Sequence, residues 1–256
     1  GNDAGETLAG LAAEQADTRT YLTGVEENVT RLENIKNGLE MKLASRKKQL
    51  DEADAAEQQA SRQLEAAQQR LQVLGDLERN MDGYQQSVKT VMRAAQNRRL
   101  RGIIGPVSSI LTVEPGYEMA IETALGFALQ NIVVEGETAA KAAIAFLRDE
   151  KAGRATFLPL DTVKGTHFDA ARLSGSARVA SGLVKYDKKY DNIVANLLGR
   201  IVVVDDINEA SRVARALDYR NRVVTADGQV INAGGSFTGG SVSRSAGLFS
   251  RKQEME

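Results

Sequence analysis

The side chains in this sequence that could perform chemistry are few. Cysteine is absent and His167 is the single histidine. Disulfides, thiolate catalysis and cysteine-ligated zinc are therefore excluded, and a histidine-rich metal centre cannot form. His167 lies among Gly, Thr and Asp residues, and no serine occupies a G-x-S-x-G nucleophile elbow. We therefore interpret His167 as an exposed loop residue and expect no triad chemistry.

Two segments suggest nucleotide chemistry at first sight. The run Ile201–Asp206 looks like a Walker B strand, and the segment Gly234–Gly240 reads GGSFTGG. A P-loop requires G-x-x-x-x-G-K-[ST], because its lysine must reach the phosphates, and no such lysine follows a glycine loop here. A buried strand that ends in a helix cap formed by Asp206 and Glu209 explains the first segment without a ligand. We expect no cofactor site in this chain.

The glycine-rich segment Gly234–Gly240 has two interpretations on residue chemistry alone. It follows a predicted strand directly, and Phe237 is its one large apolar side chain. Glycine at a strand end marks a place where φ must be positive or where another backbone approaches closely. The segment is therefore either a flexible loop or a sheet edge built for contact.

The elements that position these segments differ sharply along the chain. The first 105 residues contain no proline and are dominated by helix-forming residues. From Leu22 to Ala95 one heptad register runs without interruption, and 17 of its 22 a and d positions are apolar. A spacing of 3.5 residues places these side chains on one narrow stripe, as the seam of a coiled coil requires.

A helix of this length, on the order of 110 Å at 1.5 Å per residue, is too long to lie on its own globular domain. The seam therefore predicts a partner helix. Alanine at three successive d positions, Ala53, Ala60 and Ala67, allows close approach, while charged residues such as Lys36 and Arg46 interrupt the stripe.

Charge and hydropathy limit the partners of the chain. The net charge of −1 divides into −4 over residues 1–95 and +3 over residues 96–256. Neither part is polycationic, so any binding of nucleic acid must come from a local patch. No apolar run approaches the roughly 18 residues of a membrane span, and we expect neither a membrane partner nor a signal peptide.

After about Gln96 the pattern becomes that of an α/β or α+β domain. We predict two sets of elements, separated by a polar stretch at 161–176. Asp227-Gly228 between two β-rich runs predicts a hairpin turn. The predicted strands are 102–111, 131–135, 155–160, 201–205, 222–226 and 229–233, and the predicted helices are 117–130, 138–151, 190–198 and 208–217.

Several motifs of this second part resemble the hinge domain of structural maintenance of chromosomes (SMC) proteins, most closely those of bacteria. The resemblance covers roughly residues 98–247, and its last two motifs together are the most specific. The motifs are Arg101–Gly105 with Val107, GYE-x-AIE-x-ALG at 116–126, LQNIVV at 129–134, GRATFLPL at 153–160 and GGSFTGG at 234–240.

The resemblance implies an α/β (α+β) fold of two subdomains after a long coiled-coil helix. The expected division is an incoming coiled-coil arm at 1–97, hinge subdomain I at 98–165, hinge subdomain II at 166–247, and the start of an outgoing coiled coil at 248–256. In the family the two coil strands are antiparallel, so most of the natural seam partner of the arm is expected to lie outside this sequence.

The resemblance also places the glycine-rich segment at the contact between two hinges. An edge strand can pair along its whole length only where side chains do not block the approach. The expected homodimer interface comprises Gly234, Gly235, Ser236, Phe237, Thr238, Gly239 and Gly240.

Family hinges bind DNA weakly through basic residues near the coil, and here only Arg244 follows the glycine motif closely where several lysines are common. For each basic cluster a solvated charged face remains the alternative to DNA contact. The candidates are Arg98, Arg99, Arg101, Arg244, Arg251 and Lys252 at the coil junction, and Lys185, Lys188 and Lys189 as a second cluster.

We therefore expect the dimerisation hinge of a cytoplasmic, nucleoid-associated chromosome condensation and segregation ATPase. The resemblance implies that the chain itself is not an enzyme, and that ATP and Mg²⁺ bind in head domains outside it. One alternative is a nucleotide-binding enzyme domain on a coiled-coil oligomerisation stalk, motivated by the pair Asp205-Asp206. A weaker alternative is a coiled-coil scaffold with a peptide-binding head, which would dimerise through residues 22–95.

Overall fold

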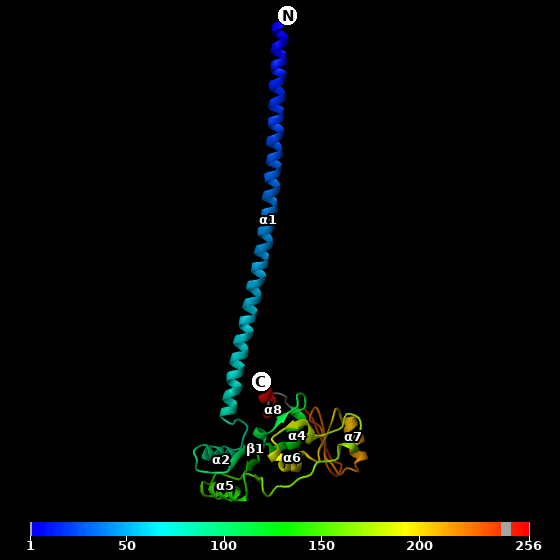
Figure 1. Cartoon of the computed structure of the whole chain (residues 1–256). Coiled ribbons are helices and arrows are strands. Elements are labelled where there is room, and N and C mark those ends of the chain that lie inside the picture. The colour runs from blue at the N-terminus through cyan, green and yellow to red at the C-terminus, as the bar shows by residue number, and fades with distance from the viewer. Residues whose placement is uncertain (1, 242–246, 256) are drawn as a thin grey trace. The chain divides into compact units, whose positions relative to one another are not determined.

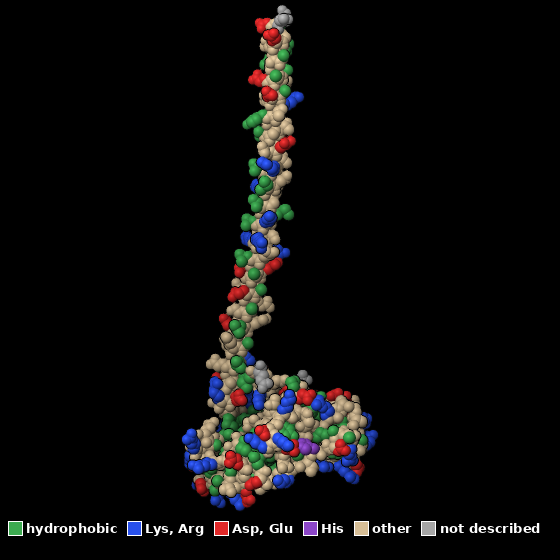
Figure 2. Space-filling model, viewed as in Figure 1, with side chains coloured by type: hydrophobic (Ala, Val, Ile, Leu, Met, Phe, Trp, Pro, Cys, Tyr) green, Lys and Arg blue, Asp and Glu red, His purple; other side chains and the backbone are tan. Residues whose placement is uncertain are grey.

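The computed structural model describes residues 2–241 and 247–255 and divides after Arg70 into two compact units. The first unit is part of one helix, α1 (Asn2–Arg79), coloured blue to cyan in Figure 1. Its apolar seam is exposed: Leu22, Leu39, Leu43 and Leu64 retain 54 to 71% of their accessible surface. Green side chains accordingly appear along α1 in Figure 2. No helix among residues 2–241 and 247–255 is both long and apolar enough to cross a membrane.

The heptad register runs to Ala95, but the helix that carries its first part ends earlier. The helix α1 ends at Arg79, and α2 begins only at Gln86 and ends at Gln96. The turn between them contains Gly83 at φ +90° and Met81 at φ +50°, conformations that no helix accommodates. In α2 the apolar stripe is buried in the α/β unit, where it packs against α5 (Glu137–Asp149) and β1 (Ile103–Pro106).

The second unit contains a small sheet of order β1-β3-β4. The strand β3 (Ile132–Val134) pairs antiparallel with β1 and parallel with β4 (Phe157–Pro159), and α5 connects β3 to β4. Because side chains of a strand alternate between its faces, Ile132 and Val134 face α2 and α5 while Val133 faces the opposite way. The small sheet is therefore buried on both faces.

A larger sheet of order β10-β9-β8-β7-β5 forms the other side of this unit. Its Val202 and Val204 pack against α7, while Val203 and Val224 face the helices α4 and α6. Val133 of the small sheet belongs to the same cluster as Val203, so one central core lies between the two sheets. The bounds are β5 (Arg178–Val179), β7 (Val202–Val204), β8 (Val223–Thr225), β9 (Val230–Ile231), β10 (Phe237–Thr238), α4 (Glu118–Leu125), α6 (Asp191–Leu198) and α7 (Ile207–Ala216).

Short elements join the two sheets. The strands β2 (Thr112–Val113) and β6 (Val184–Lys185) pair antiparallel, although each lies next to a different sheet in the chain. Beside them Nη1 and Nη2 of Arg178 donate to the Glu114 carboxylate, at 3.1 and 3.0 Å. The remaining elements are α3 (Val107–Ile110), α8 (Leu248–Met255), and the 3-10 helices η1 (Gly126–Gln130), η2 (Ala170–Arg172), η3 (Ala180–Leu183) and η4 (Lys188–Tyr190).

Most predicted strands and helices of the α/β unit are confirmed, with strands shorter than predicted and with α5 and α7 beginning one residue earlier. The hairpin predicted at Asp227-Gly228 joins β8 to β9, and Asp206 caps α7 by accepting a hydrogen bond from the Glu209 amide at 2.9 Å. The predicted strand 102–111 is wrong beyond Pro106, where α3 begins. The predicted boundaries at 97, 165 and 247 stay predictions.

Candidate functional site

The glycine-rich segment is an ordered hairpin. Its strand β10 pairs antiparallel with β9, so that Phe237 lies opposite Ile231 and Thr238 opposite Val230. The side-chain amide of Gln229 holds the end of the hairpin, because its oxygen accepts from the Gly240 amide at 2.8 Å and its nitrogen donates to the Gly240 carbonyl at 3.1 Å. These contacts favour the sheet-edge interpretation over that of a flexible loop.

The glycines of this hairpin shape the turn. Gly234 and Gly235 have φ of +89° and +92°, a region that disfavours any residue with a Cβ atom. The Gly234 amide donates to the Tyr219 carbonyl at 2.9 Å, which fixes the turn to the segment that follows α7. The need for glycine at both positions therefore comes from the turn itself. A substitution at either residue would strain the turn even in a chain without a partner.

The strand β10 is the last strand of the larger sheet, and its outer edge has no neighbouring strand among the described residues. Phe237 on this strand is 59% exposed, a large fraction for an aromatic side chain. An exposed edge of this kind offers backbone donors and acceptors to another chain. Sequence reasoning identified the segment as a possible sheet edge, and the structure shows that it contains the strand β10.

The small sheet has a second open edge, which sequence reasoning did not single out as a site. The strand β4 is terminal in the order β1-β3-β4, and it follows the exposed residue Thr156. Pro159 closes this strand, and because proline has no amide hydrogen the edge available for pairing is short. The signal that could have revealed this edge is the GRATFLPL motif itself.

The structure separates the basic candidates at the coil junction. Arg98, Arg99 and Arg101 are exposed at the C-terminal end of α2, where Arg99 pairs with Glu150 at 2.9 Å and lies over the Phe146 ring. Arg251 instead contacts the turn that precedes α2, and roughly 16 Å of helix separates the two ends of α2. The structure therefore does not bring these arginines together. Arg244 lies outside the described residues.

The lysines of the second cluster lie close together in the chain and are exposed. Lys185 is on β6, Lys188 and Lys189 are in η4, and Nζ of Lys189 lies 5.0 Å from the centre of the Tyr190 ring. Tyr186 between them donates to Asp191 at 2.9 Å, and burial together with this bond raises the pKa of Tyr186 to about 12.

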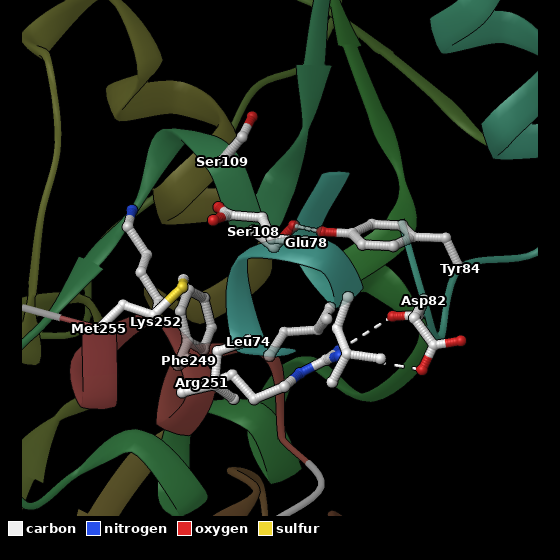
Figure 3. Close-up of a pocket in the computed structure, with 12 residues that line it drawn as sticks. Leu74, Glu78, Asp82, Tyr84, Ser108, Ser109, Phe249, Arg251, Lys252 and Met255 are labelled. Carbon is white, nitrogen blue, oxygen red and sulfur yellow. Dashed lines mark hydrogen bonds and ion pairs between the residues drawn. The ribbon is translucent and has the colours of Figure 1, made fainter. Parts of the chain in front are cut away.

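A cavity of about 200 Å³ lies where α8 meets the last turns of α1 (Figure 3). Leu74 and Phe249 form its apolar side. The hydroxyls of Tyr84 and Ser108 lie 2.5 Å apart on another side, and burial raises the pKa of Tyr84. Arg251 is only 13% exposed, and its Nη2 donates to the Asp82 carbonyl at 2.9 Å. The predicted DNA candidates Arg251 and Lys252 thus line an internal junction.

His167 is an exposed loop residue, as predicted, but it has two hydrogen-bond partners. Its Nδ1 lies 2.8 Å from Oγ of Ser181, and its Nε2 lies 3.0 Å from Oδ1 of Asp191. Hydrogen bonds from Tyr186 and His167 hold the pKa of Asp191 below its usual value. Ser181 is 7% exposed, so its hydroxyl is shielded from a substrate, and the trio fastens the 161–176 segment to α6.

The Asp205-Asp206 pair that motivated a nucleotide site lies at the end of β7. Asp206 caps α7, and the Asp205 amide donates to Oγ of Ser176 at 3.2 Å. Among residues 2–241 and 247–255, no group of three or more His, Asp and Glu side chains has an arrangement that could hold a metal ion.

Two sheets that enclose one core, with a long helix before them, define a mixed α/β unit on a helical arm. The chain matches the family model described as SMC proteins Flexible Hinge Domain over residues 100–214. It is similar to the SMC hinge domain of Geobacillus stearothermophilus, solved as an asymmetric dimer, with 38% identity and a TM-score of 0.70 over 83% of this chain and 87% of that one.

A second structural neighbour is the Pyrococcus furiosus Smc hinge domain with an extended coiled coil, with 28% identity and a TM-score of 0.52 over 93% of this chain and 82% of that one. Among curated relatives, the chromosome partition protein Smc of Bacillus subtilis is 34% identical over 253 residues, which is 96% of this chain and 21% of that protein. The chain belongs to the SMC hinge family. It spans about a fifth of the length of the curated relatives it matches.

The comparisons confirm the resemblance on which the sequence analysis depended, and they confirm the fold class as a mixed helix-and-sheet domain with a long N-terminal helix. The individual interface and DNA-binding residues stay predictions.

Proposed function

We propose that this chain is a dimerisation hinge, in which two copies join through the open edges of their sheets. The observation that carries the proposal is the pre-organised β10 edge with Phe237 exposed on it. Gln229 holds the hairpin in its paired form, so little ordering entropy would be lost on association. The proposed interface is Gly234–Gly240.

The matching edge in the other copy is β4. In one chain β10 and β4 terminate different sheets, so a second copy can offer β4 to β10 and receive the reciprocal contact. In a dimer with a two-fold axis, β10 of each copy pairs with β4 of the other copy. Neither edge then stays open for a third copy, so the assembly closes at two copies. The asymmetric dimer named for the Geobacillus stearothermophilus hinge supports association of hinges of this family.

The exposed seam of α1 calls for a partner helix. Leucines more than half exposed on a helix of 78 residues are expected to pack against another helix in an antiparallel coiled coil. The extended coiled coil named for the Pyrococcus furiosus hinge supports this arrangement. We propose that α8 begins the returning strand.

In this proposal the chain is part of a cytoplasmic, nucleoid-associated chromosome-partition ATPase, whose ATP and Mg²⁺ sites lie in head domains outside this sequence. The names of the curated Smc relatives support the process, and the fraction of their length that the chain spans leaves room for such domains. The chain itself would join two copies and orient their coiled-coil helices, and it would not transform a substrate.

Weak DNA binding is a further part of the proposal. The favoured residues are Lys185, Lys188 and Lys189, with Arg98 and Arg101 as a separate exposed group. Neutralisation of about three phosphates predicts a roughly 40-fold loss of affinity between 50 and 200 mM salt. Replacement of Lys188 and Lys189 by Gln should flatten that dependence in a fluorescence anisotropy titration. An affinity independent of salt would contradict the basic-patch account.

Sedimentation of the full chain over a range of concentrations tests the dimer. A dimer that persists on dilution and survives aspartate substitutions at Leu39 and Leu43 of the seam would support the hinge contact. Loss of the dimer in those seam variants would favour a coiled-coil scaffold instead, and a monomer at every concentration would refute both. Binding of a labelled ATP analogue would favour the nucleotide-binding alternative, and we expect none.

A further inference from the structure

The C-terminal helix α8 is anchored in the α/β unit at its first turn. Phe249 is 3% exposed and belongs to the central core with Val107 and Ile121. Burial of Phe249 alone would fix one side chain and would leave the helix free to rotate about it. Polar contacts to three other segments restrict that rotation.

Glu122 of α4 supplies the first of these contacts. Its Oε1 accepts hydrogen bonds from the backbone amides of Phe249 at 2.6 Å and Ser250 at 3.3 Å. These amides belong to the first turn of α8, where no carbonyl of the helix itself can pair with them. A side chain distant in sequence therefore performs the capping that a neighbouring Ser or Asp ordinarily provides.

Gly247 completes this arrangement. A Cβ atom built on Gly247 would overlap the Glu122 carboxyl group, which provides the three nearest atoms to that position. Because Gly247 has no side chain, the Glu122 carboxylate can reach the N-terminal end of α8.

Two further side chains of α8, Arg251 and Lys252, contact other segments of the chain. Arg251 donates to the Asp82 carbonyl, and Lys252 Nζ lies 3.5 Å from the Leu111 carbonyl oxygen. Figure 3 shows Arg251 extending from α8 toward Asp82. The helix α8 is therefore tied to α4, to the turn after α1 and to the segment after α3.

The helix α4 is in turn fixed to the larger sheet. Arg222, which directly precedes β8, donates from Nη1 to the Ala124 carbonyl at 3.0 Å, near the C-terminal end of α4. A Cβ atom built on the hairpin residue Gly228 would lie 3.0 Å from Oγ1 of Thr123 and 3.2 Å from Cγ of Met119, so this turn lies beside the same helix. One short helix thus contacts both the sheet that carries β10 and the first turn of α8.

We infer that Glu122 is the positioning residue that sets where α8 begins and in which direction it leaves the α/β unit. The carboxylate, admitted by Gly247, holds α8 in a fixed orientation relative to the larger sheet. This inference goes beyond the proposed dimerisation, since it concerns contacts within one chain and would hold for a monomer.

A spin-label experiment tests the direction of α8. The chain has no native cysteine, so Gln253→Cys on α8 and Ala216→Cys on α7, both exposed, provide one defined pair of labels. Dilution of the labelled chain with unlabelled chain restricts the measured distances to pairs within one molecule. We expect a narrow distance distribution for the parent chain and a broad one for Glu122→Ala. Glu122→Gln keeps an acceptor oxygen and should restore the narrow distribution.

Gly247→Ala provides the decisive comparison. In the parent background it should displace the carboxylate, broaden the distribution and accelerate amide exchange of Phe249 and Ser250 about tenfold, as loss of a helix cap worth about 1.4 kcal/mol would. In the Glu122→Ala background the clash no longer exists, and Gly247→Ala should add nothing further. Glu118→Gln, which removes a charge from the same helix at a side chain that accepts from the Gly116 amide, should leave both measurements unchanged.

Three results would overturn the inference. They are an unchanged distribution in Glu122→Ala, an equal effect of Gly247→Ala in both backgrounds, and an equal effect of Glu118→Gln. If Glu122→Ala does not fold, Glu122→Gln combined with Gly247→Ala supplies the test, because the clash remains there and broadening is still required.

Discussion

Replacement of Phe237 by glutamate is the most direct test of the proposed hinge contact. The side chain is 59% exposed in the single chain, so the substitution should not disturb the fold of the monomer. In a dimer joined through β10, by contrast, each copy would place a carboxylate at a covered edge. A two-fold interface contains the substitution twice.

The magnitude follows from the exposed area. A phenylalanine side chain of about 200 Å² with 59% exposed leaves roughly 120 Å² to cover, worth about 3 kcal/mol per copy at 25 cal/mol/Å². Two copies give about 6 kcal/mol, and interfaces realise only part of such a sum, so we take half, about 3 kcal/mol. The dimer dissociation constant should therefore rise at least 100-fold.

The assay is sedimentation velocity of the full chain across a concentration series, with far-ultraviolet circular dichroism to confirm that the helical content is retained. Ile144→Glu is the matched control. Ile144 is also an exposed apolar side chain, at 54%, and lies on the outer face of α5 rather than on a sheet edge. An unchanged dissociation constant for Phe237→Glu, or an equal rise for Ile144→Glu, would refute the assignment of the edge.

Three further predictions concern stability, each measured as the free energy of unfolding in urea. Gly165→Ala should destabilise the chain by about 2–3 kcal/mol, because its Cβ would overlap the backbone of α6, whereas Gly182→Ala, with open space around it, should change little. Asp206→Ala should cost about 1 kcal/mol by removing the cap of α7. Burial raises the pKa of Glu122, so the part of the stability that depends on its protonation is full below the ordinary glutamate pKa and is lost as the pH rises through the raised value, while the hydrogen bonds from the Phe249 and Ser250 amides to its Oε1 remain; Glu122→Gln should abolish this pH dependence.

Features with a local signature could be predicted from the sequence. The Asp227-Gly228 turn, the cap at Asp206 and the buried valine strand β7 depend on neighbouring residues, and all three are confirmed. The specific motifs at 153–160 and 234–240 likewise indicated the SMC hinge family, which the similarity to the Geobacillus stearothermophilus SMC hinge domain over 87% of that chain confirms. Backbone propensity and short-range patterning are sufficient for such features.

Features that depend on distant partners could not be predicted in the same way. Three contacts join segments whose local sequence gives no sign that they associate. They are the pairing of β2 with β6, the contacts of His167 with Ser181 and Asp191, and the capping of α8 by Glu122. The apolar stripe after residue 85 shows the same limit. Its spacing fits a coiled-coil seam as well as a core helix, and only packing against α5 and β1 assigns it to the core.

The sequence alone determined the helical arm, the mixed fold and the family, because those depend on periodicity and motif. The tertiary structure decided where the arm ends, which edges stay open and what holds α8, because burial and hydrogen bonds between distant residues exist only once the chain has folded.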